Sequence, residues 1–121
     1  MARTVLFAAA LLLLATPALA GGADVEEVDV RRTADGSYSF SVTVRHDDEG
    51  WDHYADGWVV ETMDGEVLAE RVLHHPHVNE QPFTRSLSGV AIPPDINVVN
   101  VRARDSVHGF EGRGMTVPVP D

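Results

Sequence analysis

The 121-residue chain carries a formal charge of −10, with nineteen acidic residues against nine arginines, and it contains neither lysine nor cysteine. Its acidic surface would repel nucleic acid and anionic lipid and would attract cations, so nucleic-acid binding is disfavoured. The absence of cysteine excludes disulfides, thiol catalysis, iron–sulfur clusters and thiolate metal ligands. Histidine and carboxylate side chains remain as the available metal ligands.

The first twenty residues have the features of a secretory signal peptide. An apolar run from Val5 to Leu14 follows Arg3, and Ala18-Leu19-Ala20 is the small-x-small pattern that precedes a signal-peptidase cut. The apolar run is too short to anchor the protein as a transmembrane helix. We therefore expect cleavage of residues 1–20, no membrane span afterwards, a periplasmic or secreted location, and a single domain over residues 21–121.

Seven segments of the remaining chain have the residue patterns of β-strands. The clearest pattern is in residues 37–45, where large apolar side chains alternate with serine, threonine and arginine. Asp64-Gly65 predicts a tight hairpin turn between the third and fourth strands. The expected strands are residues 25–30, 37–45, 58–62, 67–73, 83–87, 97–104 and 115–119.

Seven short strands without helical periodicity predict an all-β fold, an antiparallel sandwich of the immunoglobulin or fibronectin type III kind. Trp58, at the start of the expected third strand, has the position at which immunoglobulin-like folds often bury a tryptophan. Pro118 and Pro120 suit the last strand to the edge of a sheet, because proline cannot donate a ladder hydrogen bond.

The histidines are confined to alternate connections between the expected strands. In an up-and-down succession of strands, the second, fourth and sixth connections lie at one end of the sandwich. These three connections are also rich in acidic residues, so this end should have a strongly negative potential. They contain all six histidines, namely His46, His53, His74, His75, His77 and His108.

This distribution predicts a metal site. His75 and His77 are two residues apart, a spacing that sends both imidazoles to the same side of an extended backbone. At least one of the histidines in the other two connections, at positions 46, 53 and 108, would complete the ligand set, and Glu80 or Asp105 would orient the imidazoles. Nitrogen ligands without soft sulfur favour Cu(II) first and zinc second. Holding or delivering the metal is then the expected function.

Two other interpretations of the same end remain open. The histidines could form a structural or pH-responsive cluster, and His46 continues the inward alternation of its strand, as a histidine at the rim of the core would. The end could instead be a contact surface for an exported protein partner. Trp51 and Tyr54 would then anchor that partner.

The sequence gives little support for an enzyme. Asp105, Ser106 and His108 lie close together in the chain, but nothing marks an activated nucleophile or an oxyanion hole. The acidic segment 47–52 lacks the alternating ligands and terminal glutamate of an EF-hand, so calcium would require another arrangement. We therefore expect no catalytic residues.

Two segments resemble small exported bacterial proteins that have no assigned function. These are residues 74–92, which read HHPHVNEQPFTRSLSGVAI, and residues 50–56, which read GWDHYAD. The resemblance extends over most of residues 21–121. It implies no activity and transfers no functional residue.

Overall fold

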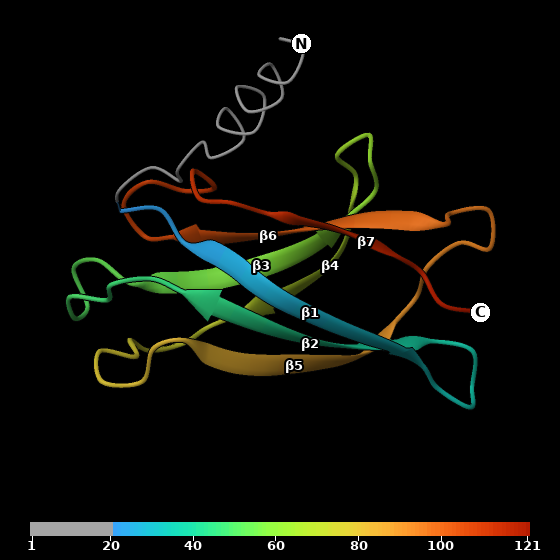
Figure 1. Ribbon diagram of the computed structural model, residues 1–121, viewed down its shortest axis with the longest axis horizontal. Coiled ribbons are helices and arrows are strands. Elements are labelled where there is room, and N and C mark those ends of the chain that lie inside the picture. Colours follow the sequence, from blue (N-terminus) through green and yellow to red (C-terminus); the bar gives the residue numbers. More distant parts are fainter. Residues whose placement is uncertain (1–20) are drawn as a thin grey trace, which may run out of the picture.

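The computed structural model describes residues 21–121, and the predicted signal peptide, residues 1–20, lies outside the described residues. Residues 21–121 form seven strands, all paired antiparallel, in two sheets and contain no helix, which confirms the predicted all-β fold (Figure 1). The strands are β1 (Asp24–Arg32), β2 (Tyr38–Arg45), β3 (Ala55–Glu61), β4 (Val67–Val72), β5 (Phe83–Val90), β6 (Val98–Asp105) and β7 (Met115–Pro118).

The strands divide three and four between the two sheets. One sheet has the order β1-β2-β5, and the other has the order β4-β3-β6-β7. The predicted turn at Asp64-Gly65 joins β3 to β4 as a hairpin, in which Gly65 has a φ of 93° that favours glycine. The last strand, β7, pairs only with β6 and lies at a sheet edge, as its prolines predict.

The core lies between the two sheets and is built from alternate residues of the inner strands. On β2, Phe40, Val42 and Val44 are fully buried, and the residues between them are half-buried. On β6 the same alternation buries Val99 and Val101. Each of these side chains contributes about 1.5–3 kcal/mol through removal of apolar surface from water.

The third strand begins earlier than its apolar residues indicate. We expected it to start at Trp58, which is fully buried as predicted, but β3 starts at Ala55. Ala55 and Gly57 extend the ladder because they pair with the end of β6. A Cβ atom on Gly57 would come within 2.6 Å of the Arg104 guanidinium, so a larger residue there would displace the end of that side chain. The extension shortens the loop that follows β2.

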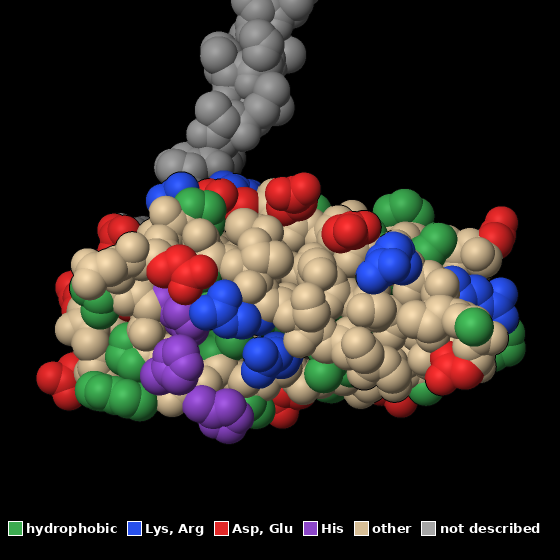
Figure 2. All heavy atoms as spheres, turned by 90° about the horizontal axis from the view of Figure 1, so that it is seen from below, with side chains coloured by type: hydrophobic (Ala, Val, Ile, Leu, Met, Phe, Trp, Pro, Cys, Tyr) green, Lys and Arg blue, Asp and Glu red, His purple; other side chains and the backbone are tan. Residues whose placement is uncertain are grey.

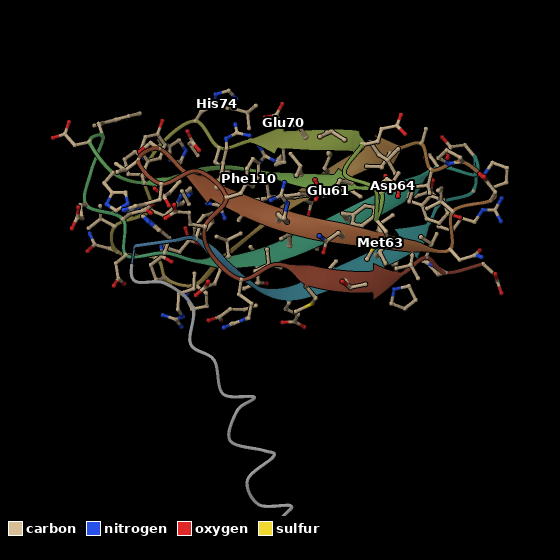
Figure 3. The ribbon with its side chains drawn as sticks, turned by 90° about the horizontal axis from the view of Figure 1, so that it is seen from above. Glu61, Met63, Asp64, Glu70, His74 and Phe110 are labelled. Atoms are coloured by element: carbon tan, nitrogen blue, oxygen red, sulfur yellow. The ribbon has the colours of Figure 1, made fainter. Side chains whose placement is uncertain are left out.

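The connections alternate between the two ends of the sandwich, as predicted (Figure 1). In Figure 3, His74 lies toward one end and Met63, on the β3–β4 hairpin, toward the other. We call the end formed by residues 46–54, 73–82 and 106–114 the histidine end. Viewed from the β5 side, histidine side chains gather at this end of the surface (Figure 2).

Hydrogen bonds join the three connections of the histidine end into one unit. The backbone N–H of Tyr54 donates to Ser106 Oγ at 3.1 Å, and the Ser106 N–H donates to the Tyr54 carbonyl at 2.9 Å. The His77 N–H donates to Asp48 Oδ2 at 2.7 Å. Side chains from loops far apart in sequence are therefore held in a common framework.

Candidate metal centre

In two strands, one from each sheet, the inward-facing positions continue as far as the histidine end. His46 continues the buried alternation of β2, and Asp105 is the last inward residue of β6. Both are almost completely buried, with exposed fractions of 2% and 3%. The apolar core is therefore closed at this end by an imidazole and a carboxylate that face each other.

His53 completes a group of three side chains that could hold a metal ion. One ligand atom each from His46, His53 and Asp105 lies within 4.8 Å of the others. The Nε2 atoms of the two histidines are 3.2 Å apart, and His53 Nε2 is 3.1 Å from Asp105 Oδ1. His46 Nε2 is 3.9 Å from Asp105 Oδ2.

These separations match the spacing of ligands around one ion. Zinc binds histidine nitrogen at about 2.0–2.1 Å, so two ligands at a tetrahedral angle lie about 3.3 Å apart. The distances of 3.2 Å between the Nε2 atoms of His46 and His53, and of 3.1 Å from His53 Nε2 to Asp105 Oδ1, are close to this value. Small side-chain adjustments would place all three atoms on one ion.

Two carboxylates set the direction of the imidazoles. His46 Nδ1–H donates to Asp48 Oδ1 at 2.6 Å, and His53 Nδ1–H donates to Glu49 Oε1 at 3.1 Å. An ionised carboxylate can only accept, so Nδ1 carries a proton in both rings. In a neutral ring the Nε2 atom would then present its lone pair to the centre. This carboxylate–histidine arrangement is typical of metal ligands.

Electron-rich atoms therefore converge on the centre from several directions. Besides the two Nε2 atoms, the carbonyl oxygen of Gly21 lies 2.9 Å from His46 Nε2. Asp105 Oδ2 is buried and has no hydrogen-bond partner among residues 21–121. Lone pairs facing one another in a buried place require a shared cation, either a metal ion or an additional proton.

Asp105 is held in its ionised form by the start of the β6–β7 connection. Burial raises the pKa of Asp105, but it is outweighed by the backbone N–H groups of His108 and Val107, which donate to Oδ1 at 2.7 and 2.9 Å, together with the neighbouring imidazoles. The pKa therefore lies below its ordinary value. His108 Nδ1 also lies 3.1 Å from Asp105 Oδ1, which places the His108 ring beside the group.

The pKa of His53 is shifted in the opposite direction. Burial lowers the pKa of His53, but the hydrogen bond to Glu49 and the negative charge of Asp105 outweigh burial and raise it above its ordinary value. The shift of His53 reflects the negative charge of Glu49 and Asp105 beside its ring. The same field favours a bound cation.

The structure does not bring His75 and His77 into this group. Residues 74–77 belong to the connection between β4 and β5 and are not part of a strand. The two rings lie 4.9 Å apart between centroids, but His75 is exposed, and His77 is buried and stacks on Phe83 at 4.0 Å. Both ring nitrogens of His77 are buried without a hydrogen-bond partner in the described part of the chain.

The other predicted site residues lie around the same end. His74 is exposed, and Glu80 forms an ion pair with Arg85 rather than orienting an imidazole. Trp51 is 67% exposed, and its ring packs edge-on against Tyr54 at 5.6 Å. The contact surface predicted from these two aromatic residues is thus at the tip of the β2–β3 connection.

Sequence reasoning did not assign Asp48, Glu49 or Gly21 to the site, and it gave Asp105 only an orienting role. One signal could have found two of these residues. The inward alternation of β2 continues past its end through His46 to Asp48, and that of β6 ends on Asp105. Polar residues at successive inward-facing positions indicate that the apolar core ends there and that buried polar groups with specific partners begin.

One curated protein is similar to most of this chain. A protein described as "Putative lipoprotein" from Halomicrobium mukohataei is 42% identical over 95 residues, which cover 78% of this chain and 46% of that protein. The chain therefore spans about half the length of this relative. No family model matches the sequence, and no solved structure matches it. Among residues 21–121, no helix is long and apolar enough to cross a membrane.

Proposed function

We propose that this protein is an exported domain that binds one divalent transition-metal ion through His46 Nε2, His53 Nε2 and Asp105. One observation carries the proposal. Both imidazoles donate an Nδ1 proton to a carboxylate, and both Nε2 atoms face Asp105. His53 Nε2 lies 3.1 Å from Oδ1, and His46 Nε2 lies 3.9 Å from Oδ2, which is buried and has no hydrogen-bond partner among residues 21–121. A metal ion would satisfy all three atoms at once.

The donor set limits the choice of metal. Two imidazole nitrogens and one carboxylate oxygen suit Cu(II) and Zn(II), and they are poor ligands for Cu(I) because no thiolate or thioether takes part. Cu(II) binds such a set more tightly than Zn(II) when both are available. Copper is therefore the first candidate and zinc the second.

A role in holding or delivering the metal fits the surroundings better than catalysis. His46 and Asp105 are almost fully buried, and within residues 21–121 no serine or threonine hydroxyl hydrogen-bonds to either side chain. The signal-peptide pattern in residues 1–20 and the similarity to a protein described as a lipoprotein support export. The ion would then be collected outside the cytoplasm.

Metal titration of the chelator-treated domain, residues 21–121, tests the proposal. Calorimetry with Cu(II) and with Zn(II) is expected to give one tight site. His53→Ala should weaken binding by about 100-fold, since each lost interaction of about 1.4 kcal/mol costs tenfold. The exposed His74→Ala is the matched control and should bind like the original chain. Equal binding by the two variants, or binding only at the level of an exposed histidine, would contradict the proposal.

A pH-responsive contact surface is the second candidate, and one contact favours it. The Gly21 carbonyl can only accept, so a doubly protonated His46 would donate to Gly21 as well as to Asp48. Nitrogen NMR shifts of the metal-free domain at neutral pH distinguish the candidates. A charged His46 together with no metal binding would favour the contact surface, whereas a neutral ring with a free Nε2 would favour the metal.

A further inference from the structure

The backbone of Gly21 lies against two of the histidine rings. Its carbonyl oxygen is 2.9 Å from His46 Nε2, the atom that faces the centre. A Cβ atom on Gly21 would come within 2.6 Å of His108 Cε1, so a side chain at this position would displace the ring. Residue 21 is thus a glycine where the main chain itself approaches the candidate ligands.

The segment that follows Gly21 is fixed to the β6–β7 connection. Ala23 is fully buried, and the Val25 N–H donates to the Arg113 carbonyl at 2.7 Å. The Arg113 N–H donates in return to Asp24 Oδ1 at 2.7 Å. Gly22 packs so closely on Gly112 that a Cβ atom would come within 2.7 Å of its nitrogen. The position of Gly21 is therefore set by packing.

The predicted signal-peptidase cut falls immediately before this residue. Hydrolysis of the Ala20–Gly21 peptide bond consumes one water molecule and leaves a carboxylate on Ala20 and a primary amine on Gly21. An amide nitrogen has no lone pair free for a metal ion, whereas an amine has one. The amine nitrogen and carbonyl oxygen of one residue can bind the same ion in a five-membered ring.

We propose that removal of the signal peptide completes the metal centre, because the α-amino nitrogen and carbonyl oxygen of Gly21 then bind the same ion as His46, His53 and Asp105. This inference rests on the proposed function. It gives the processed chain five ligand atoms and leaves the precursor with an incomplete set. Tight metal binding would accordingly begin only after export.

The composition of the chain makes this inference directly testable. The sequence contains no lysine, so a chain that starts at Gly21 has a single primary amine, its own α-amino group. Acetylation of that amine gives a matched control that has the same sequence and keeps the Gly21 carbonyl. Both chains are titrated with Cu(II) and Zn(II), and the rate of amine acylation is measured with and without the metal.

Loss of a direct ligand should cost at least as much as loss of an orienting residue, so acetylation is expected to weaken metal binding by about tenfold or more. Bound metal should also slow acylation of the free amine in the original chain, and it should not do so in His53→Ala. Equal affinity of the free and acetylated chains, with unchanged acylation, would overturn this inference and leave the proposed function standing. If neither chain binds metal, the proposed function fails and this inference fails with it.

Discussion

Two histidine groups lie at the same end of the sandwich and differ in what surrounds their ring nitrogens. In the first, His46 and His53 each donate Nδ1–H to a carboxylate and direct Nε2 at Asp105. In the second, His77 stacks on Phe83 with both nitrogens unpartnered among the described residues, and His75 faces solvent. In the first group carboxylates orient the imidazole rings, whereas in the second the two rings merely lie close together.

The difference shows that closeness in sequence is a weaker guide to a metal site than the residues that orient the ligands. His75 and His77 are two positions apart, yet no carboxylate bonds to either ring. His46 and His53 are seven positions apart and are oriented by Asp48 and Glu49. Such fixed contacts orient the ligand side chains before the ion binds.

Asp48 connects the two groups, and its removal should have the largest effect. It accepts from His46 Nδ1–H, from the Ala55 N–H at 2.9 Å and from the His77 N–H. Asp48→Ala would leave these donors buried without partners and should lower the free energy of unfolding by about 3 kcal/mol. Urea denaturation measures this change. Asp47→Ala, at the exposed neighbouring position, should change it by less than about 0.5 kcal/mol.

Paired variants compare the two groups directly. His46→Ala/His53→Ala removes both oriented nitrogens and should reduce Cu(II) affinity by at least about 100-fold, which corresponds to about 2.7 kcal/mol. His75→Ala/His77→Ala should leave the affinity unchanged within about twofold. Calorimetric titration of both variants gives the answer. The reverse result would indicate that the metal binds at the β4–β5 connection.

The orienting acids provide a smaller test of the same comparison. Glu49→Gln weakens the hydrogen bond that fixes His53 and should reduce metal affinity by about tenfold, the lower end of the range for such residues. Glu80→Gln alters an acid that pairs with Arg85 and should have no effect. Competition against a coloured chelator can resolve a tenfold change. Similar losses in the two variants would indicate that general negative charge, not orientation, attracts the ion.

The pH dependence of stability should separate His77 from His53. Burial holds the pKa of His77 in the folded chain below its ordinary value of 6.5. As the pH falls below 6.5, the unfolded chain therefore binds a proton at His77 more readily than the folded chain does, and the fold loses stability. The pKa of His53 is raised, so in the metal-free chain its contribution is present at low pH and is lost as the pH rises through the raised value.

His77→Phe keeps the stacking on Phe83 and removes the two unpartnered nitrogens. It should therefore stabilise the fold by about 1 kcal/mol at pH 7 and by more at pH 5.5. Thermal unfolding of the metal-free chain at the two pH values measures both effects. An unchanged pH dependence would mean that His77 finds a partner in solution.

Much of the fold follows from alternation in the sequence. The pattern of residues 37–45 predicts β2 almost to its ends, and Asp64-Gly65 predicts the hairpin between β3 and β4. The start of β3 could not be predicted in the same way. Ala55 and Gly57 have weak strand preferences, and they join the ladder only because the end of β6 lies beside them.

The candidate site was predictable in its location and in its residue types but not in its membership. Alternation of the connections places all six histidines at one end, which the structure confirms. Which of them converge depends on contacts across long stretches of sequence, such as the 52 positions between His53 and Asp105. No local pattern encodes that distance. Only the inward-facing positions of His46 and Asp105 in their strands indicate from the sequence that these two side chains converge.

The two tryptophans of this protein occupy opposite environments. Trp58 is fully buried, and Trp51 is 67% exposed on a turn closed by bonds between Glu49 and His53 and between His53 and Gly50. The indole fluorescence of the chain should therefore have one component at short wavelength and one at long wavelength. Because Trp51 shares its turn with His53, quenching of the long-wavelength component would report ion arrival without any added dye.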